Sequence, residues 1–268
     1  MSNLKNIIDV DKLLIHAQPI INLKSNDANL QYFEILSRFL NNEGNMLYPD
    51  EVFPKLNSDS LIELDILILE TTYKKLNQMS SILNKDYMAT INISAETIKN
   101  KLDFFDYLKQ LEEKHAINSE NITLEINEKS NEGLTDFVIK TLTNNYSLAI
   151  DDFGTKNFPI QKLRYDVLVE VEKESPALLK KVKVKLDQSF IKNLDIDNAL
   201  DNAIDHAFID MILTVKNRFK GIEIVAEGVE TLNIANLLSN KGIDFGQGYF
   251  WKKPALLDES YSQPLFER

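Results

Sequence analysis

With 268 residues, 44% of them hydrophobic, the chain is long enough to bury a sizeable apolar core, and its length suits a single eightfold α/β barrel. The net charge of −11 excludes broad, nonspecific binding to DNA and to anionic membranes, because the long-range field of the protein repels both. The absence of cysteine excludes disulfide bonds and thiolate metal sites. No apolar stretch approaches the length of a membrane span, and the first residues lack a signal-peptide core, so we expect a cytoplasmic protein.

Strand-like runs alternate with amphipathic helical patterns along the chain, which is typical of a mostly parallel sheet. We expect eight strands, over residues 16–23, 30–39, 87–94, 122–127, 147–153, 182–187, 222–227 and 245–250. The short polar stretch between the first two strands leaves no room for a crossover helix, so these two strands should form an antiparallel hairpin. No linker or change of composition divides the chain, and the prediction is one domain over residues 1–268.

Several of the expected strands end at an acid, an amide or a lysine: Glu34, Asn92, Glu125, Lys185, Glu227 and Gln247. Glu34, Glu125 and Glu227 lie between apolar neighbours, where a carboxylate is costly unless it is paired or bound to a metal ion. Catalytic residues of α/β barrels gather at the C-terminal ends of the strands. These residues therefore predict an active site at one rim of a barrel.

The sequence Ile150-Asp151-Asp152-Phe153-Gly154 places two adjacent acids at the end of an apolar run. Consecutive residues of a strand point to opposite faces, but at a strand end the chain curls and both carboxylates can approach a pair of metal ions. An ordinary acidic turn closed by Gly154 is the alternative interpretation. Oxygen ligands without cysteine, and with few histidines, favour Mg²⁺ or Mn²⁺ over Zn²⁺.

Lys181, Lys183 and Lys185 alternate with two valines. One interpretation is a solvated edge strand; the other places Lys185 at the acidic rim, where it orients a water or takes a proton. The three histidines, His16, His115 and His206, show no mutual spacing or common partner, so no catalytic triad is expected. Each histidine is assigned to the surface or to a satisfied core position.

Taken in order, these residues resemble the EAL-domain family of bacterial cyclic di-GMP phosphodiesterases, over about residues 14–257. The resemblance lies in Gln18-Pro19-Ile20, Glu34-Ile35-Leu36 with Arg38, Asn92-Ile93-Ser94, Leu124-Glu125-Ile126-Asn127-Glu128, Asp151-Asp152-Phe153-Gly154-Thr155, Lys185-Leu186-Asp187, Ala226-Glu227-Gly228-Val229-Glu230 and Gln247-Gly248-Tyr249-Phe250. Any one of these motifs is weak, but the whole series in this order is specific.

The resemblance implies an α/β fold, a modified TIM-type (β/α)8 barrel with one antiparallel early strand. It implies hydrolysis of cyclic di-GMP to linear pGpG with two Mg²⁺ or Mn²⁺ ions. The metal ligands would be Glu34, Asn92, Glu125, Asp151 and Asp152. Lys185 and Glu227 would position or deprotonate the attacking water, Gln247 would support the site, and Glu128 would brace the loop after Asp152. The residues that touch the substrate would be Gln18, Leu36 and Arg38. A homodimer is also implied, because members of the family commonly pair near this loop.

Three departures from the family pattern leave a second function open. After Thr155 the family has Gly-Tyr-Ser-Ser, whereas this chain has Lys156-Asn157-Phe158-Pro159, which should stiffen or redirect the loop. Residues 165–179 look like an insertion that begins strand-like and then turns acidic, and residues 54–58 lack the family's acidic pair. The alternative is a weakly active or inactive EAL-type domain that acts as a cyclic di-GMP receptor or a protein-binding regulator, with a protein partner at residues 156–179.

Overall fold

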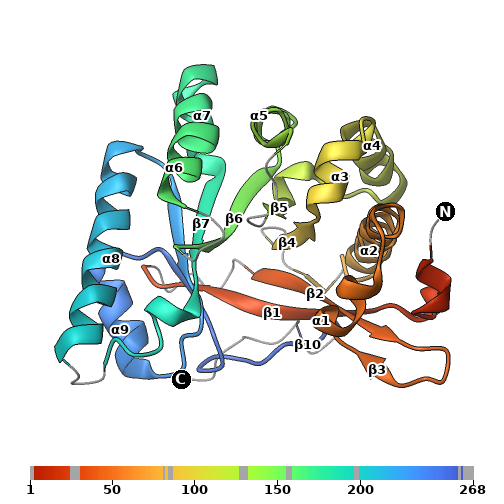
Figure 1. Ribbon diagram of the computed structural model, residues 1–268, viewed down its shortest axis with the longest axis horizontal. Helices are drawn as coiled ribbons and strands as arrows, with labels where there is room; N and C mark the ends of the chain where they lie inside the picture. Colours follow the sequence, from red (N-terminus) through yellow and green to blue (C-terminus); the bar gives the residue numbers. More distant parts are fainter. Residues whose placement is uncertain are drawn as a thin grey trace.

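The computed structural model of the protein describes residues 3–24, 31–80, 82–83, 87–126, 132–154, 159–195, 199–258 and 261. Ten strands of these ranges form one sheet in the order β10-β1-β9-β8-β7-β6-β5-β4-β2-β3, and β1 also pairs with β2 (Figure 1). The strands between β10 and β3 therefore close into an eight-stranded barrel, as expected. Its members are β1 (Leu14–Asn22), β2 (Tyr32–Leu40), β4 (Met88–Ile93), β5 (Ile122–Ile126), β6 (Ser147–Phe153), β7 (Val182–Leu186), β8 (Glu223–Ala226) and β9 (Phe245–Gln247).

The first strand of the barrel runs against its neighbours. β1 pairs antiparallel with both β2 and β9, whereas the pairs from β2 through β4 to β9 are all parallel. This confirms the predicted hairpin and the single antiparallel early strand. Two short strands that the sequence did not predict, β3 (Met46–Leu47) and β10 (Ala255–Leu256), pair antiparallel with the ends of β2 and β1.

β1 and β2 extend beyond the rim of the barrel. Only Tyr32–Glu34 of β2 pair with β4, and the rest of β2 pairs with β1 and β3 alone. The order β3-β2-β1-β10 thus forms a small antiparallel side sheet next to the C-terminal ends of the parallel strands.

Helices cover the outer face of the barrel (Figure 1). The longer ones are α2 (Ser58–Gln78), α4 (Phe104–His115), α5 (Leu134–Thr143), α8 (Ala199–Arg218) and α9 (Leu232–Lys241), and the shorter ones are α1 (Pro49–Val52) and α3 (Ala95–Asn100). The main core lies between helices and strands, where α2 buries Leu64, Leu69 and Leu76 completely. A second cluster lies inside the barrel and consists of Ile20, Tyr32, Val225 and Phe245.

The strand-like interpretation of residues 165–171 is wrong, because this segment is helical. Residues 160–174 form one helix made of α6 (Ile160–Lys162), a π-helical turn η5 (Leu163–Leu168) and α7 (Val169–Glu174). Leu163, Val167 and Val171 recur every four residues and are fully buried, so the apolar side chains follow a helical period. The helix packs against α5, and a 3₁₀ segment, η6 (Pro176–Lys181), leads into β7.

Within the ranges that the structure describes, none of the helices combines the length and the apolar character that crossing a lipid bilayer requires.

Candidate active site

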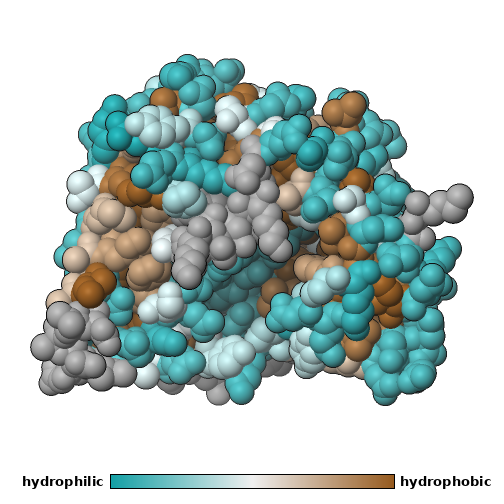
Figure 2. Space-filling model, in the orientation of Figure 1, coloured by the Kyte–Doolittle hydropathy of each residue, from teal (hydrophilic) through white to brown (hydrophobic). Residues whose placement is uncertain are grey.

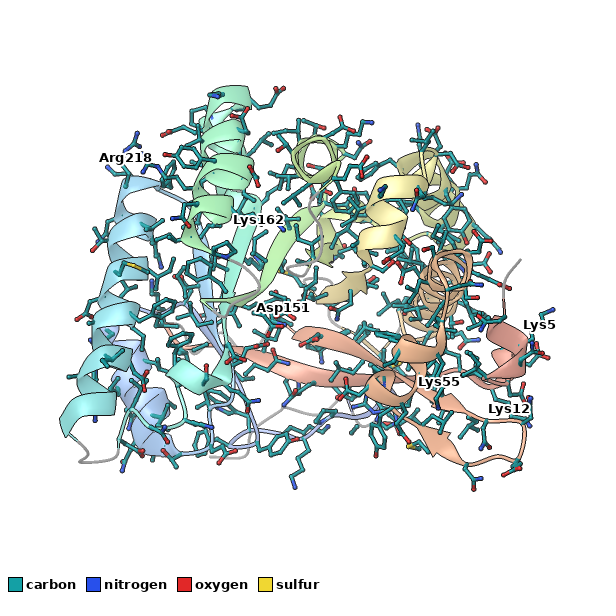
Figure 3. All side chains as sticks on the ribbon, viewed as in Figure 1. Lys5, Lys12, Lys55, Asp151, Lys162 and Arg218 are labelled. Atoms are coloured by element: carbon teal, nitrogen blue, oxygen red, sulfur yellow. The ribbon has the colours of Figure 1, made fainter. Side chains whose placement is uncertain are left out.

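The polar strand ends meet at the C-terminal rim of the barrel, around the ammonium group of Lys185. This lysine lies on β7, is 2% exposed, and its Nζ contacts four carboxylates from four other places in the sequence. The distances from Nζ are 3.3 Å to Glu34 Oε2, 2.8 Å to Glu125 Oε1, 3.1 Å to Asp151 Oδ1 and 2.8 Å to Glu227 Oε1. In Figure 2 the face that carries this site is hollowed at its centre and the hollow is lined by hydrophilic residues; Figure 3 labels Asp151 at the same place.

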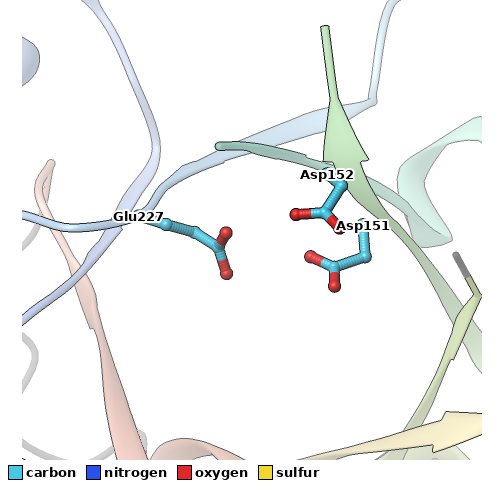
Figure 4. Close-up of side chains that lie close together, drawn as sticks. All are labelled: Asp151, Asp152 and Glu227. Atoms are coloured by element: carbon cyan, nitrogen blue, oxygen red, sulfur yellow. The ribbon is translucent and has the colours of Figure 1, made fainter. Parts of the chain in front are cut away.

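A bulge in β6 turns both aspartates toward the site. The register between β6 and β7 shifts between Ile150 and Phe153, and Asp152 has a φ of 52°, in the left-handed region. The two carboxylates therefore escape the alternation of a regular strand and point to the same side. Figure 4 shows both facing Glu227, with carboxylate oxygens of all three residues within 4.8 Å of one another.

Two amides, Gln247 and Asn92, hold the carboxylate of Glu34, and a third, Gln18, holds Gln247. Gln247 Nε2 donates to Glu34 Oε2 at 2.8 Å and to Gln18 Oε1 at 3.1 Å. Asn92 Nδ2 donates to the other oxygen of Glu34 at 3.3 Å, and Gln18 Nε2 donates to the backbone oxygen of Lys252 at 3.1 Å. The orientation of Glu34 is thus fixed from β1, β4 and β9.

Burial and crowding shift the pKa values of these groups. Burial disfavours the charge on Lys185, but the four surrounding carboxylates outweigh it and hold the pKa of this lysine well above its usual range. Burial raises the pKa of Glu125 well above its ordinary value, although Lys185 opposes the shift. Burial also raises the pKa of Glu227 to about 8. Four acids facing one base therefore leave the site short of positive charge.

The same residues fit divalent cations. In the described part of the chain, Glu125 Oε2 and Asp151 Oδ1 are buried without a hydrogen bond; the contact between Asp151 and Lys185 is an ion pair without hydrogen-bond geometry. A buried carboxylate oxygen without a donor is costly, and a bound cation removes that cost. Oxygen-only ligands suit Mg²⁺ and Mn²⁺. The cluster is therefore a candidate metal centre.

Comparison with known proteins identifies the family of the chain. The sequence profile of the EAL domain matches residues 1–254. The chain belongs to the EAL-domain family. The probable cyclic di-GMP phosphodiesterase PdeG of Escherichia coli strain K12 is 25% identical to this EAL domain, over 94% of this chain and 46% of that protein. The cyclic di-GMP phosphodiesterase PdeA of Borreliella burgdorferi is 28% identical, over 82% of this chain and 31% of that protein. The chain spans less than half the length of these curated relatives.

A solved structure has the same architecture as this EAL domain. The EAL enzyme Bd1971, in the form with cAMP and cyclic di-GMP bound, is 26% identical and superposes with a TM-score of 0.76. The match covers 93% of this chain and 64% of that chain. The barrel described above therefore has the architecture of the EAL domain.

Some site residues of the EAL domain were missed by the sequence analysis. Beside the cluster lies a cleft of about 300 Å³, whose walls include Asp187, Gln188, Glu230 and Tyr249 as well as predicted residues. Each of the four lies within three residues of a predicted site residue. Their closeness in sequence to the polar strand ends is therefore the signal by which they could have been found. The chain needs a glycine at Gly248, where a Cβ atom would lie 2.0 Å from the backbone oxygen of Val229.

Other predicted residues of the EAL domain lie away from the cluster or outside the described residues. Leu36 and Arg38 lie further out, on the side sheet; Arg38 Nη1 donates to the backbone oxygen of Ser37 at 2.9 Å, and its guanidinium lies 5.1 Å from the ring centroid of Tyr48. Glu128 lies outside the described residues, as do residues 156–158 of the altered loop.

The edge-strand interpretation of the lysines is wrong. β7 lies between β6 and β8, and all five of its residues are buried, including Lys183 and Lys185. The alternation that suggested solvent exposure instead places both lysines inside the barrel, at its two ends.

Proposed function

We propose that this EAL domain, as one unit over the chain, hydrolyses one phosphodiester bond of cyclic di-GMP and releases linear pGpG, with two Mg²⁺ or Mn²⁺ ions. One observation supports this more than any other: a buried lysine surrounded by four carboxylates, two of which have a buried oxygen without a hydrogen bond, at the C-terminal rim of an EAL barrel. The names of the relatives as cyclic di-GMP phosphodiesterases supply the substrate.

In this proposal the metal ligands are Glu34, Asn92, Glu125, Asp151 and Asp152. The bound cations would offset the negative charge of the phosphodiester and make a water molecule more acidic. Gln18 and Gln247 keep the carboxylate of Glu34 in place through the hydrogen bonds described above.

Lys185 and Glu227 take different parts in the same proposal. The four carboxylates keep Lys185 protonated, so this lysine acts as a hydrogen-bond donor that orients the attacking water and the substrate oxygens. Glu227 lies opposite the aspartate pair, with a carboxylate oxygen within 4.8 Å of theirs, and it is not among the proposed metal ligands. Glu227 is therefore the group suited to accept the proton of the water.

Incubation with cyclic di-GMP and Mn²⁺ tests the proposal. The expected result is pGpG, with no product when a chelator removes the metal. Glu34→Ala should abolish turnover, because it removes a proposed metal ligand and the acceptor of two amides, and its far-UV circular dichroism should match that of the wild type. Glu174→Ala, which changes an exposed glutamate at the end of α7, is the matched control and should keep full activity. Unchanged hydrolysis in Glu34→Ala would show that the site is assigned wrongly.

The same assay separates the alternative function. A receptor or protein-binding regulator would bind cyclic di-GMP and release no pGpG. The structure of residues 159–179 favours neither function, since their helix packs against α5 and none of the cluster contacts described above involves these residues. The homodimer, a protein partner at residues 156–179 and the cytoplasmic location stay predictions.

A further inference from the structure

A row of side chains leads from the carboxylate cluster out along the side sheet. In the register of β1 and β2, Gln18 lies opposite Glu34, the next pair outward is His16 and Leu36, and the last is Leu14 and Arg38. Residues directly opposite in an antiparallel pair share a face. Ile20 on β1 and Tyr32 on β2 are each two residues from Gln18 and Glu34, so they lie on the same face, and both lie inside the barrel. His16 therefore lies on the face that continues the interior of the barrel past its rim.

The opposite face of these two strands is the main core. Ile15, Ala17 and Ile35 are each at most 4% exposed and belong to the cluster beneath the helices. His16 is partly exposed, and in the described part of the chain neither of its ring nitrogens makes a hydrogen bond. Of the two positions predicted for His16, the surface or a satisfied core, the structure is closer to the first. The two ring nitrogens of its imidazole are therefore available for hydrogen bonds on the face that holds Glu34.

The imidazole of His16 has both hydrogen-bonding functions. Burial, and then the neighbouring charge of Arg38, lower the pKa of His16, so the ring is neutral at neutral pH. A neutral imidazole offers one N–H donor and one acceptor nitrogen. It differs in this respect from Arg38, which can only donate.

The spacing of the row suits a nucleotide. Side chains two residues apart on a strand are separated by about 7 Å. His16 thus lies about 7 Å beyond Gln18 and Glu34, and the Arg38 position lies about 14 Å beyond them. A phosphodiester held at the carboxylate cluster would extend its attached nucleoside over the first of these steps, onto His16 and Leu36. A guanine base offers the acceptors O6 and N7 and also donor groups, whereas an apolar side chain at position 16 could serve neither.

We propose that His16 is a specificity-determining residue that hydrogen bonds to the guanine base next to the scissile phosphodiester, with Leu36 forming the apolar part of the same subsite. This proposal rests on the proposed function, because it takes its substrate from there. His16 does not touch the reacting atoms, and so it contributes to binding and leaves the chemical step unchanged.

Steady-state kinetics on two substrates test this role. Cyclic di-GMP carries the base, whereas bis(p-nitrophenyl) phosphate is a phosphodiester without one. For His16→Ala we expect KM for cyclic di-GMP to rise about tenfold with kcat within about twofold, and no change with bis(p-nitrophenyl) phosphate. His16→Gln keeps a donor and an acceptor and should recover most of the affinity. His115→Ala, at the C-terminal end of α4, is the matched control and should behave as the wild type.

Two results would overturn the proposal: an unchanged KM for cyclic di-GMP in His16→Ala, or an equal loss on both substrates, which would indicate a general structural defect. Calorimetric binding of cyclic di-GMP separates this proposal from the proposed function. If the wild type binds the nucleotide without cleaving it, the proposed function fails; about tenfold weaker binding by His16→Ala would then still support the subsite, and equal binding would refute it.

Discussion

Two buried lysines of the same strand have opposite surroundings. Lys185, at the C-terminal end of β7, contacts four carboxylates, and some of their oxygens have no other donor. Lys183, two residues earlier, pairs with Glu223 alone at 2.5 Å, and its ammonium lies 5.7 Å and 5.8 Å from the ring centroids of Tyr32 and Phe245. The first lysine lies in a site that is short of positive charge, and the second lies in one that is balanced.

The comparison shows what burial of a charged residue indicates. Both lysines are nearly inaccessible, at 3% and 2%, so burial alone does not distinguish a catalytic group from a structural one. The balance of charge does. At the N-terminal end of a barrel a charged residue commonly serves stability, and the pairing of Lys183 with one acid and two rings fits that use. At the C-terminal end the excess of carboxylates is a cost to folding that metal binding would offset.

Within this comparison the largest expected effect comes from Lys185→Met, which keeps most of the length of the side chain and removes its charge. We expect kcat for cyclic di-GMP to fall about 10³-fold, because the donor that orients the water and substrate is lost while the metal ligands remain. Steady-state kinetics at saturating Mn²⁺ measure this loss. If the variant retained more than a tenth of wild-type kcat, the catalytic role assigned to Lys185, as opposed to the structural role of Lys183, would be contradicted.

A third buried charge, Asp65 on α2, tests whether an unbalanced carboxylate outside the rim acts on stability alone. Its Oδ2 accepts hydrogen bonds from Ser94 N at 2.8 Å and Thr97 Oγ1 at 2.6 Å, and no described cation pairs with it. Burial raises the pKa of Asp65 to about 6. A raised folded-state pKa means that its stability contribution is full below the ordinary value of 3.8 and is lost as the pH rises through about 6.

That loss amounts to about 3 kcal/mol, from a shift of about two pKa units at about 1.4 kcal/mol each. In Asp65→Asn the amide oxygen can accept the same two bonds without a charge. The difference in the free energy of unfolding, variant minus wild type, should therefore increase by about this amount as the pH rises from 4 to 7. Urea denaturation of both proteins across this range, with a chelator present, measures the difference. Parallel pH curves would show that Asp65 does not titrate as described.

The smallest effect is expected at the balanced lysine. Lys183→Met leaves Glu223 without its partner, but the Glu223 side chain is 33% exposed and water can solvate it, while a methionine packs well against Tyr32 and Phe245. We expect a loss of about 1 kcal/mol in the free energy of unfolding and a kcat within about twofold of the wild type. Thermal melts and the same kinetic assay measure both. A loss of activity comparable to that of Lys185→Met would contradict the assignment of stability to the N-terminal end of the barrel and of catalysis to its C-terminal end.

Most of the fold could be predicted because the pattern of each barrel strand is local. The apolar runs, their lengths and the short polar stretch after the first strand were enough to predict the eight barrel strands and the antiparallel hairpin. Residues 165–171 were the exception. Three valines within five residues suggested a strand. The buried residues are Leu163, Val167, Leu168 and Val171, which follow a helical period, and this period is visible only in a window that begins before residue 165.

The candidate site was predicted in its residue types and missed in its details. Glu34, Glu125 and Glu227 stood out because each interrupts an apolar run, whereas Asp187, Gln188, Glu230 and Tyr249 follow the strands in connecting segments, where polar and aromatic residues are ordinary. His16 carried no signal, because the residues that flank it, Leu36 and Arg38, come from the neighbouring strand and are brought beside it by the register of the pair.

The sequence by itself determined which residues alternate inward and outward on each strand, and therefore that carboxylates, amides and lysines would end the barrel strands. Only the tertiary structure decided that the bulge at Asp151 and Asp152 turns two neighbouring acids to one side, and that Lys183 and Lys185 belong to different environments. The physical reason is that alternation is a property of the local backbone, whereas the charge balance around a buried group depends on strands far apart in the sequence.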